Sequence, residues 1–371
     1  MTPLDNVAFD EHLASRRIAA RDELLHLAQS MSQRNSPQHW DAVKDIPKNA
    51  FLEPRLFTQF SQPTFDLTTL QQLLLSQFQE RTVLIAVKTD SQGAISIPGL
   101  GTCDTGTPAT TGTATYLTSG NQLSVQLHGQ AAQTFKLKAA VHVPGTEIEL
   151  VRYLDPAVSA FLRSHSVDFE KTQLVFPTAE HREQIARALT LIERASPAFH
   201  TMLHESIRSL CLYHHPSDAS FAALGIHGML FFNVPTTTTV GYFIDELAHQ
   251  GGHVLFSEAT LHRQDFFTVD PDTPMSEVIG DDDARSAYDT FHGLYTEFTV
   301  SQILNAISNL GVAKADEATG IRHHFDIVME HSSRDIALVE SCAEKLFTSL
   351  GHRVFAQFKD SYDRIQSPVT Q

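Results

Sequence analysis

The chain has 371 residues, with 27 Lys and Arg against 43 Asp and Glu, which gives a formal charge of −16. This charge would repel a phosphate backbone and no basic stripe offsets it, so nucleic acid is not an expected partner. No apolar run approaches the roughly 18–20 residues that a membrane span needs, and the first residues, MTPLDNVAFDEHLASRR, do not have the pattern of a signal peptide. We therefore expect a cytoplasmic protein without a membrane segment.

The first half of the chain predicts helices followed by strands. Apolar residues recur at helical spacing over 9–31 and again over 67–78, which predicts an N-terminal helical region at 1–81. From residue 82 onward the pattern changes to short β-favouring runs, such as VLIAV and LSVQLHG, separated by Gly, Asn and Thr. This change predicts a small antiparallel β unit at 82–151.

The second half of the chain is dominated by long amphipathic patterns, interrupted by one extended piece, MLFFNVP at 229–235. Together they predict a mainly helical domain at 152–371 and an α+β fold class for the whole chain. The expected helices cover 155–166, 178–194, 199–213, 241–256, 284–310, 320–333 and 334–358.

Twenty histidines are many for this length, and two pairs have a spacing of four residues: His200/His204 and His249/His253. Histidines four apart on a helix project from one face and can chelate one metal ion. The first pair, in FHTMLHES, has the ordinary pattern of an amphipathic helix, so we interpret it as core or surface histidines. The second pair is therefore the stronger metal-site candidate.

The context of the second pair is unusual because Gly251 and Gly252 lie between the histidines. Each glycine inside a helix costs about 1 kcal/mol relative to alanine, so its presence predicts a close-lying ligand or element. In the alternative interpretation the two glycines end the helix and the histidines flank a turn.

Three segments over about 228–356 are GMLFFNVPTTTTVGYFIDELAHQGGHVLF, DDDARSAYDTFHGLYTEFTVSQIL and HHFDIVMEHSSRDIALVESCAEKLFTSLGHRVF. Together they resemble the C-terminal core of the HExxH-motif peptide-modifying proteins, which are 2-oxoglutarate-dependent β-hydroxylases. The matching positions are His249 and His253, then Arg285 seven residues before His292, then FTSLGHRV at 347–354. Gln250 stands where the family has Glu.

The change to Gln250 separates two kinds of metal chemistry. A zinc peptidase uses the motif Glu as the base that takes a proton from metal-bound water, and an amide cannot accept that proton. An iron oxygenase needs three protein ligands and open positions but no such base. Asp245 or Glu246 is then expected to help orient His249 in place of the missing carboxylate.

The resemblance implies Fe(II) held by His249, His253 and His292, with O₂ and 2-oxoglutarate as co-substrates and Arg285 as the cation for the distal carboxylate of 2-oxoglutarate. Arg285 could instead form a surface salt bridge with the acidic run 281–283, leaving Arg322 or Arg353 for that role. The implied reaction hydroxylates an unactivated C–H, at the β-carbon, of an amino-acid residue in a peptide or on a carrier. The open alternatives are a non-catalytic peptide-binding homologue and a zinc hydrolase that uses Glu246 as its base.

Overall fold

The computed structural model describes residues 11–35, 37–60, 70–78, 83–117, 120–166, 168–280 and 282–366. With 58% of the chain helical and 17% in strands, the fold is an α+β mix, as predicted. The chain forms two compact units: a helical unit, Met1–Arg21, Glu183–Ser206 and Thr236–Gln371, and a β-rich unit, Asp22–Arg182 and Ile207–Pro235. Helices α1 (Glu11–Asn35) and α6 (Ala179–Ala195) have residues in both units. The division at residues 81 and 151 stays a prediction.

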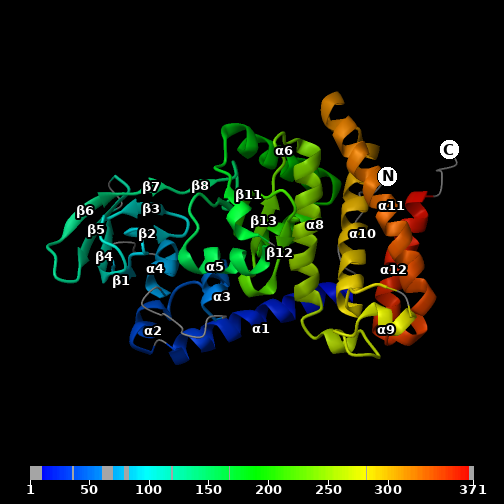
Figure 1. Ribbon diagram of the computed structural model, residues 1–371, viewed down its shortest axis with the longest axis horizontal. Coiled ribbons are helices and arrows are strands. Elements are labelled where there is room, and N and C mark those ends of the chain that lie inside the picture. Colours follow the sequence, from blue (N-terminus) through cyan, green and yellow to red (C-terminus); the bar gives the residue numbers. More distant parts are fainter. Residues whose placement is uncertain are drawn as a thin grey trace. The chain divides into compact units, whose positions relative to one another are not determined.

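The β-rich unit contains the short antiparallel strands that the sequence predicts after residue 82 (Figure 1). One sheet has the order β1-β4-β5-β6, and another has the order β2-β3-β7. Alternate residues of β1, β2, β3 and β5 are buried, and the two sheets contribute to one apolar core that includes Ile85, Val125 and Leu137. The strands are β1 (Leu84–Lys88), β2 (Ala94–Ile97), β3 (Gly101–Asp104), β4 (Thr111–Leu117), β5 (Gln122–Leu127), β6 (Gln133–Lys136) and β7 (Lys138–Ala139).

A third, mixed sheet of this unit has the order β12-β13-β11-β9-β8, with β10 also paired to β11. The extended piece at 229–235 is confirmed as strand β13, but the helix predicted over 199–213 is wrong beyond Ser206, because 209–214 form strand β11. Strand β11 is buried along most of its length and runs parallel to β13, so it lacks the alternation that distinguishes a strand from a buried helix. The strands are β8 (Val141–His142), β9 (Glu149–Leu150), β10 (Gln173–Leu174), β11 (Ser209–His214), β12 (Phe221–Ala222) and β13 (Met229–Asn233).

Short helices complete the β-rich unit: α2 (Pro37–Val43), α3 (Pro54–Phe60), α4 (Leu70–Leu74) and α5 (Pro156–His165). The helix predicted over 67–78 is confirmed from Leu70, and its first three positions lie outside the described residues. On α3, the buried Arg55 forms ion pairs with Glu53 and Glu149. Arg55 also borders a cavity of about 380 Å³ in this unit.

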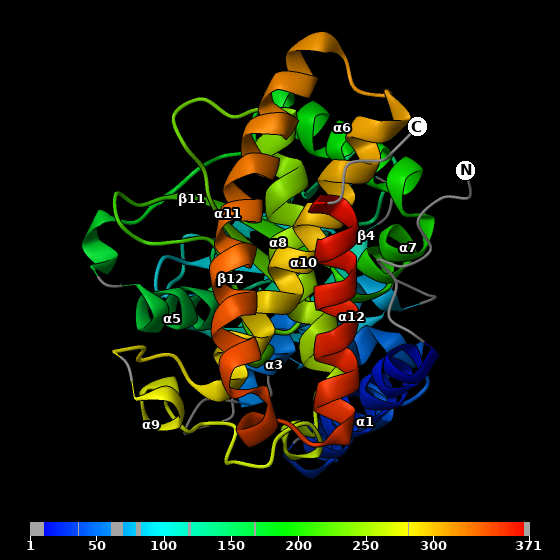
Figure 2. The same cartoon turned by 90° about the vertical axis from the view of Figure 1, so that its right-hand side faces the viewer.

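The helical unit is built around α8 (Val240–Ala259), α10 (Ala287–Leu310) and α11 (Ala315–Leu346), which pack side by side, with α12 (Ser349–Gln366) against α10 (Figure 2). The shorter α7 (Pro197–Ser206) packs on α8, and α9 (Met275–Ile279) packs on α11. The two helices predicted over 320–333 and 334–358 are divided differently: α11 runs unbroken to Leu346, and the break falls at Phe347–Thr348.

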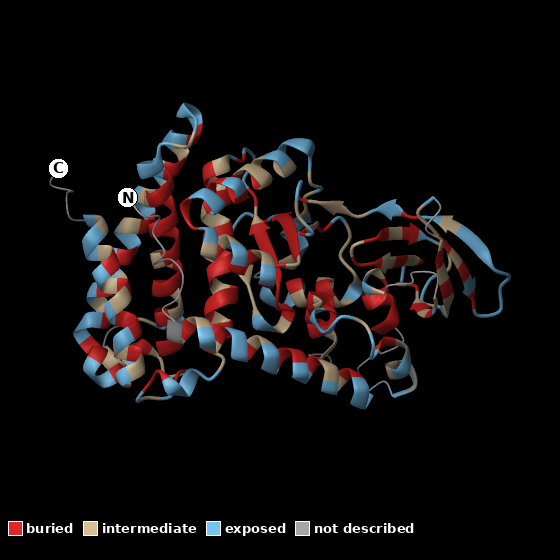
Figure 3. Ribbon diagram, turned by 180° about the vertical axis from the view of Figure 1, so that it is seen from behind, coloured by how far each residue is buried: buried red, intermediate tan, exposed pale blue. Residues whose placement is uncertain are grey.

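Burial follows this arrangement, because α8 and α10 are mostly buried whereas α11 and α12 expose one face (Figure 3). Ser286 caps α10 by accepting a hydrogen bond from the Asp289 amide, and Gly311, with φ of 60°, ends it in the left-handed conformation. In the part of the chain that the structure describes, no helix is both long and apolar enough to cross a lipid bilayer.

Candidate metal centre between α8 and α10

Helix α8 continues through Gly251 and Gly252 to Ala259, so the glycines do not end the helix. A Cβ added at Gly251 would lie 2.3 Å from Cδ2 of Leu203 on α7, and one at Gly252 would lie 3.4 Å from Cγ2 of Thr296 on α10. The glycines therefore allow α7 and α10 to approach α8 closely from two sides. The sequence predicts that glycines inside a helix make room for a close-lying ligand or element, and here they make room for neighbouring helices.

The three predicted ligands lie next to one another in the helical unit. His249 and His253 are one turn apart on α8, and their ring centroids are 5.0 Å apart. His292, in the second turn of α10, has its ring centroid 4.5 Å from that of His253. All three residues are partly accessible, so the group is neither sealed in the core nor spread on the surface.

Burial favours the neutral form of each imidazole. It lowers the pKa of His249, where the charge of His331 adds to the effect and Asp245 opposes it. It lowers the pKa of His253 further, with His292 and His249 as additional like charges. It lowers the pKa of His292 to about 4. Metal ligation requires a neutral imidazole, so the protonation state of the group suits a divalent cation at neutral pH.

One hydrogen bond determines which nitrogen His292 can offer. Its Nε2 lies 3.1 Å from the carbonyl oxygen of His253, which accepts only from an N–H. The proton is therefore on Nε2, and Nδ1 carries the lone pair. A hydrogen bond of this kind to a backbone carbonyl commonly fixes the tautomer of a ligating histidine.

The three rings are neighbours, but they do not yet surround a common point. Among the described residues, the structure has no group of three or more His, Cys, Asp or Glu side chains placed to hold a metal ion. The chemistry of the three donors fits Fe(II) or Zn²⁺, which bind imidazole nitrogen. Ligation would require the donor nitrogens of the three rings to be brought together, and each of the three residues is partly accessible.

Aromatic side chains cover one side of His292. The rings of Tyr288 and Phe256 have centroids 5.2 Å and 5.4 Å from that of His292. Phe256 is stacked on Tyr295, with centroids 4.5 Å apart. All three aromatic residues are buried, so they exclude water from this side of the group. The sequence shows them only as apolar positions of two helices.

Gln250, which departs from the family motif, is 4% exposed. Its Nε2 donates a long hydrogen bond of 3.4 Å to Oε2 of Glu246, and its Oε1 has no hydrogen-bond partner among the described residues. Asp245, the other carboxylate expected to help His249, lies 2.6 Å from Nδ1 of His324 on α11. Asp245 still acts on His249, whose pKa it raises against the effect of burial.

Arg285 lies just outside α10, because Ser286 is the N-cap residue. The helix predicted over 284–310 therefore begins three residues later, at Ala287, and does not include Arg285. The guanidinium forms ion pairs with Asp283 at 2.8 Å and Asp335 at 2.5 Å, and these carboxylates raise its pKa. Its charge is thus already balanced, as in the salt-bridge alternative. Of the other two candidates, Arg322 pairs with Asp326 at 3.2 Å and Arg353 is exposed on α12.

An open cavity of about 310 Å³ lies beside this ion pair, lined by Arg285, Glu297, His331, Arg334 and Asp335. Within the described ranges, Arg334 forms no ion pair, although its charge lowers the pKa of Glu297, so its charge is balanced less directly than that of Arg285. Burial raises the pKa of Glu297 to about 8, helped by Asp335 and opposed by Arg285. His331, which lines this cavity, also lowers the pKa of His249 through its charge. Glu297 and Arg334 were not predicted, because each is an isolated charge in an amphipathic pattern.

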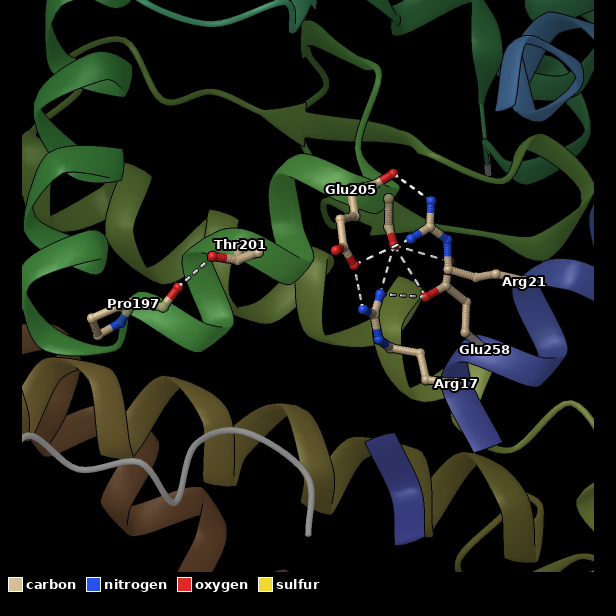
Figure 4. Close-up of polar contacts among 7 residues, drawn as sticks. Arg17, Arg21, Pro197, Thr201, Glu205 and Glu258 are labelled. Carbon is tan, nitrogen blue, oxygen red and sulfur yellow. Dashed lines mark hydrogen bonds and ion pairs between the residues drawn. The ribbon is translucent and has the colours of Figure 1, made fainter. Parts of the chain in front are cut away.

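The last turn of α8 is held by a buried network of ionic groups (Figure 4). Glu258 is fully buried and accepts hydrogen bonds from Nη1 of Arg17 at 3.2 Å and from Oγ of Ser206 at 2.9 Å. Nε of Arg21 lies 3.5 Å from Oε1 of Glu258, the oxygen to which Ser206 donates at 2.9 Å, and Glu205 pairs with both arginines. This network fixes the end of α8 five residues beyond His253.

Comparison of the sequence with models of known protein families gives no match, and comparison with curated proteins gives none either. The assignment of a function therefore depends on the geometry of the site and on the motif spacing.

Proposed function

We propose that the chain is an Fe(II)- and 2-oxoglutarate-dependent oxygenase that hydroxylates an unactivated C–H, at the β-carbon, of an amino-acid residue in a peptide or on a carrier. The observation that carries the proposal is the grouping of three neutral imidazoles, His249, His253 and His292, on two helices in direct contact. The motif spacing assigns the ligands to the same three positions.

In this proposal the three histidines hold the metal through their neutral nitrogens, and His292 uses Nδ1 because Nε2 donates to the backbone. When bound, Fe(II) supplies with O₂ and 2-oxoglutarate the oxidising power that attack on a C–H bond needs. The buried rings of Phe256, Tyr288 and Tyr295 keep one side of the site dry. Arg334 attracts the anionic co-substrate, since the charge of Arg285 is balanced by two aspartates.

Three histidines can also hold a metal ion for hydrolysis, and Gln250 disfavours that chemistry. Its amide cannot accept a proton from metal-bound water, so hydrolysis would need another base. Glu246 is favoured for that role, because its carboxylate lies 3.4 Å from the Gln250 amide. A zinc hydrolase with Glu246 as base is therefore the second candidate. A peptide-binding homologue without a metal would show neither activity.

The experiment that tests the proposal is an anaerobic titration of the protein with Fe(II) and 2-oxoglutarate. We expect the weak visible charge-transfer band of the iron–2-oxoglutarate chelate, and O₂-dependent release of succinate. His253→Ala and His292→Ala should abolish the band, and His204→Ala should keep it as the matched control. Absence of the band in iron-loaded wild-type protein would overturn the oxygenase assignment, and peptide cleavage with Zn²⁺ that is lost in Glu246→Gln would support the hydrolase.

A further inference from the structure

A second histidine pair lies on α7, the helix that packs on α8. His200 and His204 are one turn apart, and their Nε2 atoms are 3.0 Å from each other. The ring centroids are 4.3 Å apart and the ring planes are inclined at 61°, a T-shaped arrangement. Both residues are partly accessible to solvent.

Both imidazoles favour the neutral form, which leaves lone pairs for a ligand. Burial lowers the pKa of His200 and of His204, and for His200 the charge of His204 adds to the effect. The carboxylate of Glu193, near the end of α6, opposes the shift at both rings. Glu193 is thus an acidic side chain whose charge acts on both rings.

The separation of the two nitrogens matches the distance between two nitrogen ligands of one metal ion. Nitrogen ligands lie about 2.0–2.1 Å from a divalent transition metal, so two ligands at right angles are about 3.0 Å apart. When no ion is bound, a direct N–H···N hydrogen bond gives the same distance. We propose that His200 and His204 chelate a divalent late transition-metal ion, of the class of Zn²⁺, Ni²⁺ or Cu²⁺.

This second site does not depend on the proposed function. It is a two-point chelate, consistent with the finding that, among the described residues, no three such side chains are arranged around an ion, and water would complete its coordination. Leu203 lies between the two histidines in sequence and fills the space that Gly251 leaves on α8. An ion that links the two histidines would therefore rigidify the turn of α7 that packs against the metal-site helix.

The test is a titration of chelator-treated protein with Ni²⁺ and with Zn²⁺, measured by calorimetry and by the shift in melting temperature. His253→Ala serves as the parent, so that the α8–α10 site does not contribute. We expect this parent to bind one ion and to melt at a higher temperature in its presence. Adding His204→Ala, or His200→Gln, should weaken binding about tenfold or more and abolish the melting shift.

The matched control is His128→Ala in the same parent, because His128 is exposed in the other unit, and it should bind as the parent does. Equal affinity in the parent and in both the His204→Ala and His200→Gln variants would overturn the proposal. A different result is expected if the α8–α10 site binds no metal. Wild type and His253→Ala would then bind metal identically, and His204→Ala would still lose metal binding.

Discussion

Restoring the motif residue with Gln250→Glu places a second carboxylate beside Glu246, because the amide it replaces is 3.4 Å from that side chain. Two unit charges at that distance repel by about 5 kcal/mol at an effective dielectric constant of about 20. Glu246 is partly exposed, so screening reduces this value. We expect the variant to lose about 2–4 kcal/mol of unfolding free energy at pH 7 in metal-free protein, and to gain no peptidase activity.

The sign of the pH dependence follows from the same repulsion. A shared proton relieves it, so the folded variant binds protons more tightly than the unfolded chain. The loss of stability should therefore be small near pH 4, increase as the pH rises, and level off once the folded pair is fully ionised. Urea unfolding of wild type and variant at several pH values between 4 and 8 measures this difference.

The matched control is the exchange Glu246→Gln with Gln250→Glu, which keeps one carboxylate and one amide in the same space. It should recover most of the lost stability. A Gln250→Glu variant whose stability loss is absent, or does not change with pH, would refute the reasoning. Cleavage of peptides by the variant with Zn²⁺, with no hydroxylation by either form, would show that the chain is a disabled peptidase.

The other predictions concern the co-substrate, the anchor of α8 and the protonation of the site. Arg334→Ala should raise the concentration of 2-oxoglutarate needed for half-saturation more than Arg285→Ala does, as measured by titration of the iron–2-oxoglutarate band. The reverse order would assign the binding of the co-substrate's carboxylate to Arg285. Arg17→Ala should cost about 3 kcal/mol in urea unfolding because it leaves Glu258 buried beside a single arginine, whereas a loss below 1 kcal/mol would show the network to be dispensable. Wild type should lose up to about 3 kcal/mol of unfolding free energy between pH 6.5 and 4, because His292 becomes protonated near pH 6.5 in the unfolded chain but only near its pKa of about 4 in the folded protein. The unfolding free energy of His292→Gln should change less over this pH range.

The sequence predicted the elements of the site better than their contacts. The periodic patterns over 241–256 and 284–310 correspond to α8 and α10, because one face of each helix must be apolar to be buried. Helical spacing then brings His249 next to His253. The proximity of His292 depends on how the two helices cross, and only the motif spacing of the resemblance indicated it.

Other features depend on partners far away in the chain and leave no local pattern. The cost of Gly251 is explained only by Leu203, and the ion pair of Arg285 involves Asp335, which is 50 residues away. Strand β11 was predicted as helix because a short, fully buried apolar run fits both structures. Such cases are decided by tertiary packing, which a single sequence does not display.

The buried contact between Arg17 and Glu258 joins residues 241 positions apart. During synthesis Glu258 emerges long after Arg17, so the N-terminal helix must remain available until α8 is complete. A chain shortened by its first 21 residues would fold with the buried carboxylate of Glu258 held by Ser206 but with neither arginine to neutralise it. Attempts to trim the protein to its metal-site helices should therefore keep the start of α1, although it is remote in sequence from the site.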